Sequence, residues 1–168
     1  MISDKLATAL NQQINSELQA AYLYLAMSAY FNSRSLNGMA HWMLMQSQEE
    51  LQHAMRIYKY LSDQGVKTEL LELAKPTNTF SGVQDVFEHA LANEKLLAEK
   101  LNSLAGMALN EKDNTTYSFL EWFLTEQVEE IATCNTILDK LKLIGESGHG
   151  LLLINNELGE RQSVGMQE

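Results

Sequence analysis

Glutamates, glutamines and one histidine interrupt the apolar positions of four long stretches of this 168-residue chain. Core positions of a helical bundle recur at alternate strides of four and three residues, and on that spacing each stretch has a polar break near its middle. The breaks are Glu17 in the first stretch, Glu50 and His53 in the second, Glu94 in the third, and Gln127 and Glu130 in the fourth. Carboxylate oxygens with an imidazole inside a helical bundle are ligands that suit a pair of iron ions.

The four breaks are expected at one level of the bundle. A helix rises 1.5 Å per residue, and each break lies about 11 to 16 residues from the start of its helix, whichever way that helix points. Taken singly, a core-facing Glu is often a surface i,i+4 partner assigned to the wrong position. Four carboxylates buried together would repel one another and take up protons unless a cation neutralised them. The coincidence on four helices therefore favours a metal site.

Four long helices must position these residues. The hydrophobic periodicity predicts them near 4–32, 38–64, 82–110 and 114–144, with turn-rich segments between them. The expected N-caps are Ser3 or Asp4, Asn37, Ser81 and Asn114. A short fifth helix is expected near 149–160, where glycines bracket an apolar stretch. Its residues 151–154 are all apolar and cannot all face one bundle, so we expect part of this helix to pack against other subunits.

The connections predict the topology of an all-α, up-down-down-up four-helix bundle. Two connections are short enough to join antiparallel neighbours, whereas the middle one, 64–82, contains the only proline, Pro76. A helix of 27 residues is about 40 Å long, a length that an extended segment of nearly twenty residues can span. We therefore expect one long crossover and a single domain, 1–168.

The composition of the chain indicates which binding partners and which cellular location to expect. The formal charge is -10 and the sequence pI is about 4.8, with no run of Lys or Arg to bind phosphates, which argues against nucleic acid and for cations. No apolar run approaches the roughly 20 residues of a membrane span. Cys134 is the only cysteine, and the start MISDKLATAL lacks the pattern of a secretory signal. We expect a cytoplasmic protein that does not enter membranes.

The segments NSELQAAYLYLAMSAYF, QSQEELQHAMRIYKYL, ALANEKLLAEKLN and FLEWFLTEQVEEI resemble the ferritin family, and the resemblance covers nearly the whole chain. It implies a ferritin-like bundle with a diiron centre in each subunit. By this resemblance one iron is held by Glu17, Glu50 and His53 and the second by Glu94 and Glu130, with Glu50 bridging and Gln127 nearby.

Details of the motifs resemble non-haem bacterial ferritins more than bacterioferritins. The position after Glu50, where a bacterioferritin has its haem-binding Met, is Leu51, and the fourth helix has Gln127 and Glu130 in place of Glu-x-x-His. The resemblance therefore implies no haem. It also implies an additional iron site at Glu49, Glu126 and Glu129, although surface glutamates are ordinary at these positions.

Two aromatic residues match family positions near the diiron site. Tyr24 could supply an electron, or it is a core tyrosine with a satisfied hydroxyl. For Trp122 we favour a packing role.

The resemblance implies iron storage and detoxification by a ferroxidase that oxidises Fe(II) with dioxygen or hydrogen peroxide and stores ferric mineral in a shell of 24 identical subunits. Three alternatives differ in testable ways. A diiron catalyst of the rubrerythrin kind usually adds a Cys-x-x-Cys domain, absent here, and a DNA-protecting mini-ferritin places its ligands between subunits and often has a basic tail. A purely structural bundle would bind no stoichiometric iron.

Overall fold

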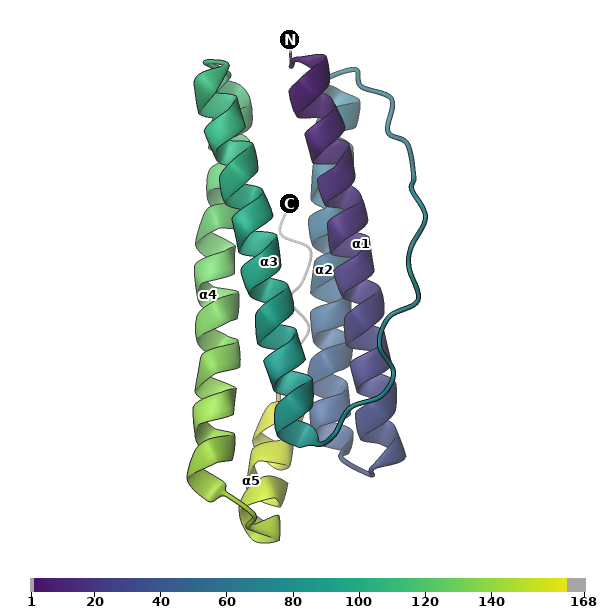
Figure 1. Cartoon of the computed structure of the whole chain (residues 1–168), viewed down its shortest axis with the longest axis vertical. Coiled ribbons are helices and arrows are strands. Elements are labelled where there is room, and N and C mark those ends of the chain that lie inside the picture. Colours follow the sequence, from purple (N-terminus) through teal and green to yellow (C-terminus); the bar gives the residue numbers. More distant parts are fainter. Residues whose placement is uncertain (1, 163–168) are drawn as a thin grey trace.

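The computed structural model describes residues 2–162 and consists of five helices joined by turns and one extended segment (Figure 1). The helices are α1 (Asp4–Ser33), α2 (Asn37–Asp63), α3 (Val83–Asn110), α4 (Asn114–Ile144) and α5 (Gly148–Gly159). Each helix limit lies within one residue of the position expected from the hydrophobic periodicity. The described part of the chain contains no strand.

Helices α1 and α2 form one antiparallel pair and α3 and α4 form another (Figure 1). The segment between α2 and α3 runs the length of the bundle outside α1, so that α2 and α3 point in the same direction. The all-α, up-down-down-up bundle with one long crossover and a short C-terminal helix is therefore confirmed.

Two hydrophobic clusters fill the bundle, one toward each end. The cluster nearer α5 includes Phe31, Met39 and Phe87, and the other includes Leu10 and Ile57. The polar residues of the four core stripes fall between these clusters on every helix. One layer of the core is thus polar, as the common level of the four breaks predicts.

Two side-chain amides of α1 hold the crossover between α2 and α3 in place. Each amide both donates a hydrogen bond to and accepts one from the backbone of a single crossover residue. Asn11 donates to the Glu69 carbonyl and accepts from its N–H, each at 2.8 Å. Gln19 binds Ala74 in the same way, at 2.9 and 2.8 Å. Because an extended segment without a strand partner has unpaired backbone groups, these contacts give the crossover a defined path along α1.

Three expected N-caps, Asn37, Ser81 and Asn114, are wrong by one residue. Before α4, Asp113 rather than Asn114 is the cap, because its carboxylate accepts both the N–H and the hydroxyl of Thr116, at 3.0 and 2.6 Å. Helix α3 begins after Gly82, and α2 after Leu36, neither of which offers a capping side chain. At α1 the cap is Ser3, one of the two expected residues.

The start of α2 is capped by a residue of α5. The Asn155 side-chain oxygen accepts from the backbone N–H groups of Gly38 and Met39, each at 3.0 Å. The helices are so close here that a Cβ on Gly38 would lie 1.7 Å from the Asn155 carbonyl oxygen, so only glycine fits. Ile154 and Leu158 are buried on the same side of α5, whereas Leu152 and Leu153 are exposed, as expected of an apolar run that cannot face one bundle.

Replacing Asn155 with alanine is expected to lower the free energy of unfolding by about 1–2 kcal/mol, the usual cost of losing a helix cap. The measurement is chemical denaturation at fixed protein concentration, since subunit association alters apparent stability. Asn156→Ala is the matched control, because the neighbouring side chain is exposed. Equal destabilisation by both substitutions would contradict the capping role.

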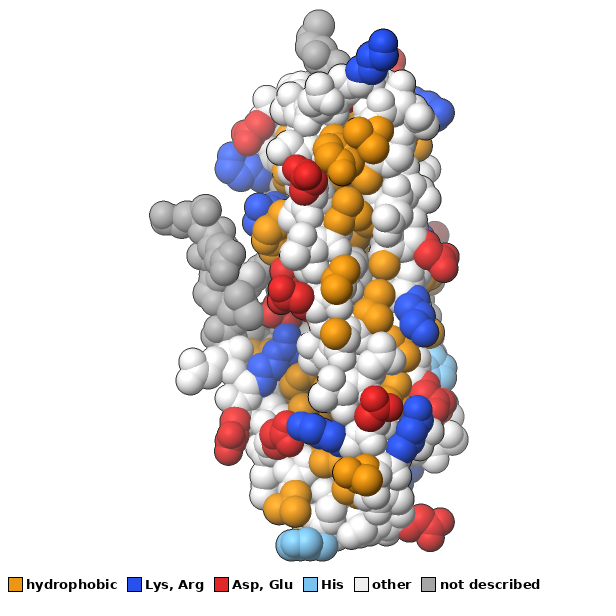
Figure 2. Space-filling model, turned by 90° about the vertical axis from the view of Figure 1, so that its left-hand side faces the viewer, with side chains coloured by type: hydrophobic (Ala, Val, Ile, Leu, Met, Phe, Trp, Pro, Cys, Tyr) orange, Lys and Arg blue, Asp and Glu red, His pale blue; other side chains and the backbone are white. Residues whose placement is uncertain are grey.

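The surface formed by α3 and α4 shows hydrophobic side chains as a broken line along the bundle, flanked by charged ones (Figure 2). None of the helices in the described residues is long and apolar enough to cross a membrane.

Candidate metal centre

Glu17 of α1 and Glu50 and His53 of α2 meet inside the bundle. One ligand atom from each lies within 4.8 Å of the others, and all three residues are buried. Glu50 and His53 are one helical turn apart, which places both side chains on the same face of α2, and the Glu50 Oε2 atom is 3.4 Å from His53 Nδ1. Within residues 2–162 this is the only cluster of acidic, His or Cys side chains with metal-ligand spacing.

The chemistry of these residues fits a bound cation. The Glu17 Oε2 and Glu50 Oε2 atoms are buried and have no hydrogen-bond partner, although buried polar atoms in proteins are nearly always paired. Burial, followed by the charge of Glu50, raises the pKa of Glu17 well above its usual value. Burial, followed by the charges of Glu94 and Glu130, does the same for the pKa of Glu50. A metal ion would supply the missing partner and the missing charge.

Glu94 of α3 is held by hydrogen bonds on both carboxylate oxygens. The hydroxyl of the fully buried Tyr24 donates to Oε1, and the Gln127 side-chain amide donates to Oε2 at 2.9 Å and to the Glu94 carbonyl at 3.0 Å. Burial raises the pKa of Glu94. The hydroxyl of Tyr24 therefore has a hydrogen-bond partner, and this partner is the candidate ligand Glu94.

Glu130 of α4 is tied to Glu50 through one amide. The Gln46 Nε2 atom donates to Glu130 Oε2 at 2.8 Å and to Glu50 Oε1 at 3.2 Å. Burial, then the charges of Glu94 and Glu49, raises the pKa of Glu130 to about 7. Carboxyl groups from all four helices therefore occupy one layer, and each has a raised pKa. Such a layer binds protons when it is metal-free and divalent cations when they are supplied.

Glu49, Glu126 and Glu129 do not gather their carboxylate oxygens at metal-ligand spacing. Glu49 is buried and forms an ion pair with Arg161, whereas Glu129 is exposed. The pKa of Glu126 is raised by burial and, to a smaller degree, by the charges of Glu129 and Glu49. The three residues are thus electrostatic neighbours, and one of them already has a cationic partner.

Aromatic rings fix the imidazole of His53. The ring of Trp122 lies edge-on to it at a centroid separation of 5.4 Å, and Phe123 does so at 5.9 Å. The Arg56 guanidinium lies 4.1 Å from the Trp122 ring centre. Trp122 thus packs against a candidate ligand.

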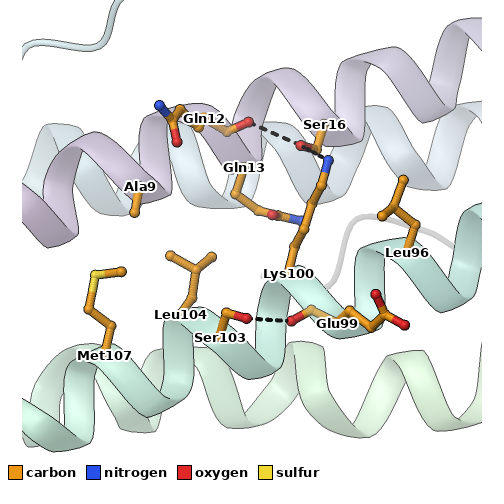
Figure 3. Close-up of a pocket in the computed structure, with 10 residues that line it drawn as sticks. All are labelled: Ala9, Gln12, Gln13, Ser16, Leu96, Glu99, Lys100, Ser103, Leu104 and Met107. Atoms are coloured by element: carbon orange, nitrogen blue, oxygen red, sulfur yellow. Dashed lines mark hydrogen bonds between the residues drawn. The ribbon is translucent and has the colours of Figure 1, made fainter.

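A cavity of about 400 Å³ lies between α1 and α3 (Figure 3). Gln13, one of its lining residues, also donates a hydrogen bond of 2.8 Å to Glu17 Oε1. Lys100 reaches across from α3 to the Ser16 hydroxyl at 3.0 Å. Gln13 is therefore shared between the cavity wall and the buried carboxylates.

Three polar residues that hydrogen-bond to candidate ligands were not predicted from the sequence. Gln46 lies four residues before Glu50 in the core stripe of the second helix, and this spacing could have indicated that it contacts the ligands. Gln13 lies beside the first stripe, next to Ile14. Arg161 follows α5, and no periodicity links it to the second helix.

A four-helix bundle whose core holds two carboxylates and an imidazole at metal-ligand spacing is the arrangement of a class of metal-binding helical bundles. Residues 7–144 match the ferritin-like domain of the Ferritin family. A bacterial non-heme ferritin of Staphylococcus epidermidis is 40% identical over 161 residues, 96% of this chain and 97% of its own length. A probable bacterial non-heme ferritin-like protein of Haemophilus influenzae is 35% identical over 159 residues, 95% of this chain and 96% of its own length.

A solved structure of an open-pore ferritin from Archaeoglobus fulgidus is similar to this chain with a TM-score of 0.95 and 42% identity. The match covers 96% of this chain and 100% of that one. The chain belongs to the ferritin family, and the resemblance to non-haem bacterial ferritins is confirmed.

Proposed function

We propose that this chain is the subunit of an iron-storing ferritin that oxidises Fe(II) at the buried carboxylate layer and stores the ferric product as mineral. The observation that carries the proposal is the pair of buried, unpartnered oxygens of Glu17 and Glu50 beside His53. A structural polar layer would pair these atoms within the protein, whereas a metal centre leaves them for the ion.

In this proposal the first iron binds Glu17, Glu50 and His53, and the second binds Glu94 and Glu130. Glu50 would bridge the two, since its charge interacts with Glu17 of the first site and with Glu94 and Glu130 of the second. Gln127 and Gln46 hold carboxylates by hydrogen bonds, and such outer contacts orient ligands. An additional iron binds at Glu49, Glu126 and Glu129, next to Glu130.

Two Fe(II) ions together give up two electrons, which with two protons from water reduce dioxygen to hydrogen peroxide, or hydrogen peroxide to two molecules of water. Four carboxylates stabilise Fe(III) more than Fe(II), because the Coulomb energy grows with the charge of the ion. In this proposal Tyr24 donates a further electron, a role supported by the hydrogen bond from its hydroxyl to Glu94.

We propose that the whole chain, 1–168, acts as one ferritin-like domain and assembles into a shell of 24 subunits in the cytoplasm. The exposed Leu152 and Leu153 of α5 support assembly, because adjacent exposed apolar side chains can form part of a patch that contacts another protein chain. The acidic net charge of -10 supports attraction of cations to the shell.

Aerobic Fe(II) addition, followed by size-exclusion chromatography with iron and protein measured in the same fractions, tests site and shell together. We expect iron to elute with a large assembly and in large excess over the about two ions per chain that a diiron site holds. Retention of about two ions on a small oligomer would instead indicate a diiron catalyst. Protein that retains no iron would contradict the metal function.

A further inference from the structure

Arg161 attaches the segment after α5 to one face of α2. Its Nη1 donates to Gln46 Oε1 at 2.7 Å, and its Nη2 binds Glu49 Oε2. Its guanidinium lies 4.7 Å from the centre of the Trp42 ring, and its carbonyl oxygen is 2.8 Å from His41 Nε2. Four contacts on one helix give this arginine a defined place beside the buried carboxylate layer.

The Arg161 contact occupies the carboxylate that the proposed additional iron site needs. The side chain of Glu49 is only 11% exposed and that of Arg161 is 20% exposed, so water screens this ion pair incompletely. The guanidinium also places a positive charge next to this carboxylate, and that charge repels a metal ion bound to either of the carboxylate oxygens. Within the described residues, no Lys or Arg forms an ion pair with Glu17, Glu50, Glu94 or Glu130.

We propose that Arg161 is a built-in cation that competes with iron for Glu49, so that undocking of its side chain from α2 controls filling of the additional iron site. The inference rests on the proposed function and specifies how one of its sites is regulated. The two ions of the inner layer bind first, because no protein cation must leave. A third ion binds Glu49 only when the guanidinium moves away from Glu49 and from the adjacent Trp42.

The test is a titration of metal-free protein with Zn²⁺, which binds carboxylate and imidazole ligands without redox chemistry. Calorimetry measures the binding steps, and tryptophan emission reports the position of Arg161. Trp42 and Trp122 are the two tryptophans of the chain, so a Trp122→Phe background leaves Trp42 as the only tryptophan that emits. Arg161→Gln removes the competing charge, and Lys59→Gln is the control, because it removes the same charge from an exposed position of α2.

We expect Trp42 emission to stay constant while the first two ions bind and to change with the third. In Arg161→Gln the third ion binds at least about tenfold more tightly, as expected when a charge-assisted competitor is removed, and Lys59→Gln leaves its affinity unchanged. Arg161→Lys keeps a competing charge and remains closer to the unsubstituted chain. The inference would be overturned if the unsubstituted chain and Arg161→Gln bound the third ion equally tightly, or if binding of the third ion to the unsubstituted chain left Trp42 emission unchanged. Identical behaviour of Arg161→Lys and Arg161→Gln would overturn it as well.

The same titration distinguishes failure of this inference from failure of the proposed function. Two tight binding steps with a third step unaffected by Arg161→Gln contradict only the role of Arg161. Absence of the first two steps in the unsubstituted chain contradicts the metal centre itself, and with it the competition at Glu49.

Discussion

Replacing Glu50 with glutamine is expected to lower the initial rate of aerobic Fe(II) oxidation by at least about 100-fold. Glu50 interacts with Glu17 in one half of the layer and with Glu94 and Glu130 in the other. Its Oε2 atom accepts no hydrogen bond and lies 3.4 Å from His53 Nδ1. The neutral amide keeps the size of the side chain but loses the charge that both ions require. A metal ligand contributes several kcal/mol, and each 1.36 kcal/mol corresponds to a factor of ten in rate.

Stopped-flow absorbance of the ferric product measures this rate, and anaerobic Fe(II) titration of the same samples measures binding. Glu88→Gln on α3 is the matched control, because its side chain is exposed. His53→Ala should lower the rate in the same direction as Glu50→Gln. Oxidation at the unsubstituted rate by an intact Glu50→Gln assembly would contradict the proposed bridging role.

The metal-free protein is expected to become more stable as the pH falls from about 8 to about 5. Glu130 has a pKa raised from 4.5 to about 7 in the folded state, so between these values the folded chain holds a proton that the unfolded chain releases. The stabilisation from this proton is fully present below the pKa of Glu130 in the unfolded chain, and it is lost as the pH rises through the pKa of Glu130 in the folded chain. The difference corresponds to about 3 kcal/mol. Glu17, Glu50 and Glu94 act in the same direction.

Chemical denaturation of metal-free protein at several pH values measures this dependence. Glu130→Gln should weaken it, because glutamine resembles the protonated carboxyl group and does not titrate. Saturating Zn²⁺ should reverse the slope, since metal ligands must be deprotonated to bind. Two results would contradict proton uptake by the metal-free carboxyl layer. One is a free energy of unfolding that decreases as the pH is lowered from 7 to 5, and the other is an unchanged pH dependence in Glu130→Gln.

The fold and the polar layer could be predicted because residue spacing along a helix is regular. A break in an apolar stripe is visible in the sequence, and a constant rise per residue converts its position into a height. Glu17, Glu50 and His53 lie together in the structure because their positions along the helices place them at the same height in the bundle. The ligand roles of Glu17, Glu50, His53, Glu94, Gln127 and Glu130 remain predictions, and the Zn²⁺ and Fe(II) titrations test them.

Contacts that depend on irregular backbone were not predictable in the same way. Asn155 replaced the expected cap at Asn37 because the approach of α5 to α2 is set by a turn and a glycine, Gly38, and not by periodicity. Arg161 contacts Glu49 from a segment that has no helical repeat. Sequence spacing specifies a residue's place on its own helix, but it does not specify which distant residue reaches that place.

The Asn155 cap has a consequence for synthesis of the chain. The two N–H groups at the start of α2 receive their acceptor from a residue that the ribosome adds 117 positions after Gly38. Chains fold from the N-terminus as they emerge, at about 5–20 residues per second, so the first turn of α2 stays uncapped for about 6 to 23 seconds after Gly38 is made. A nascent bundle is thus incomplete at the end where α5 docks, and only a chain translated past Asn155 can complete the cap of α2.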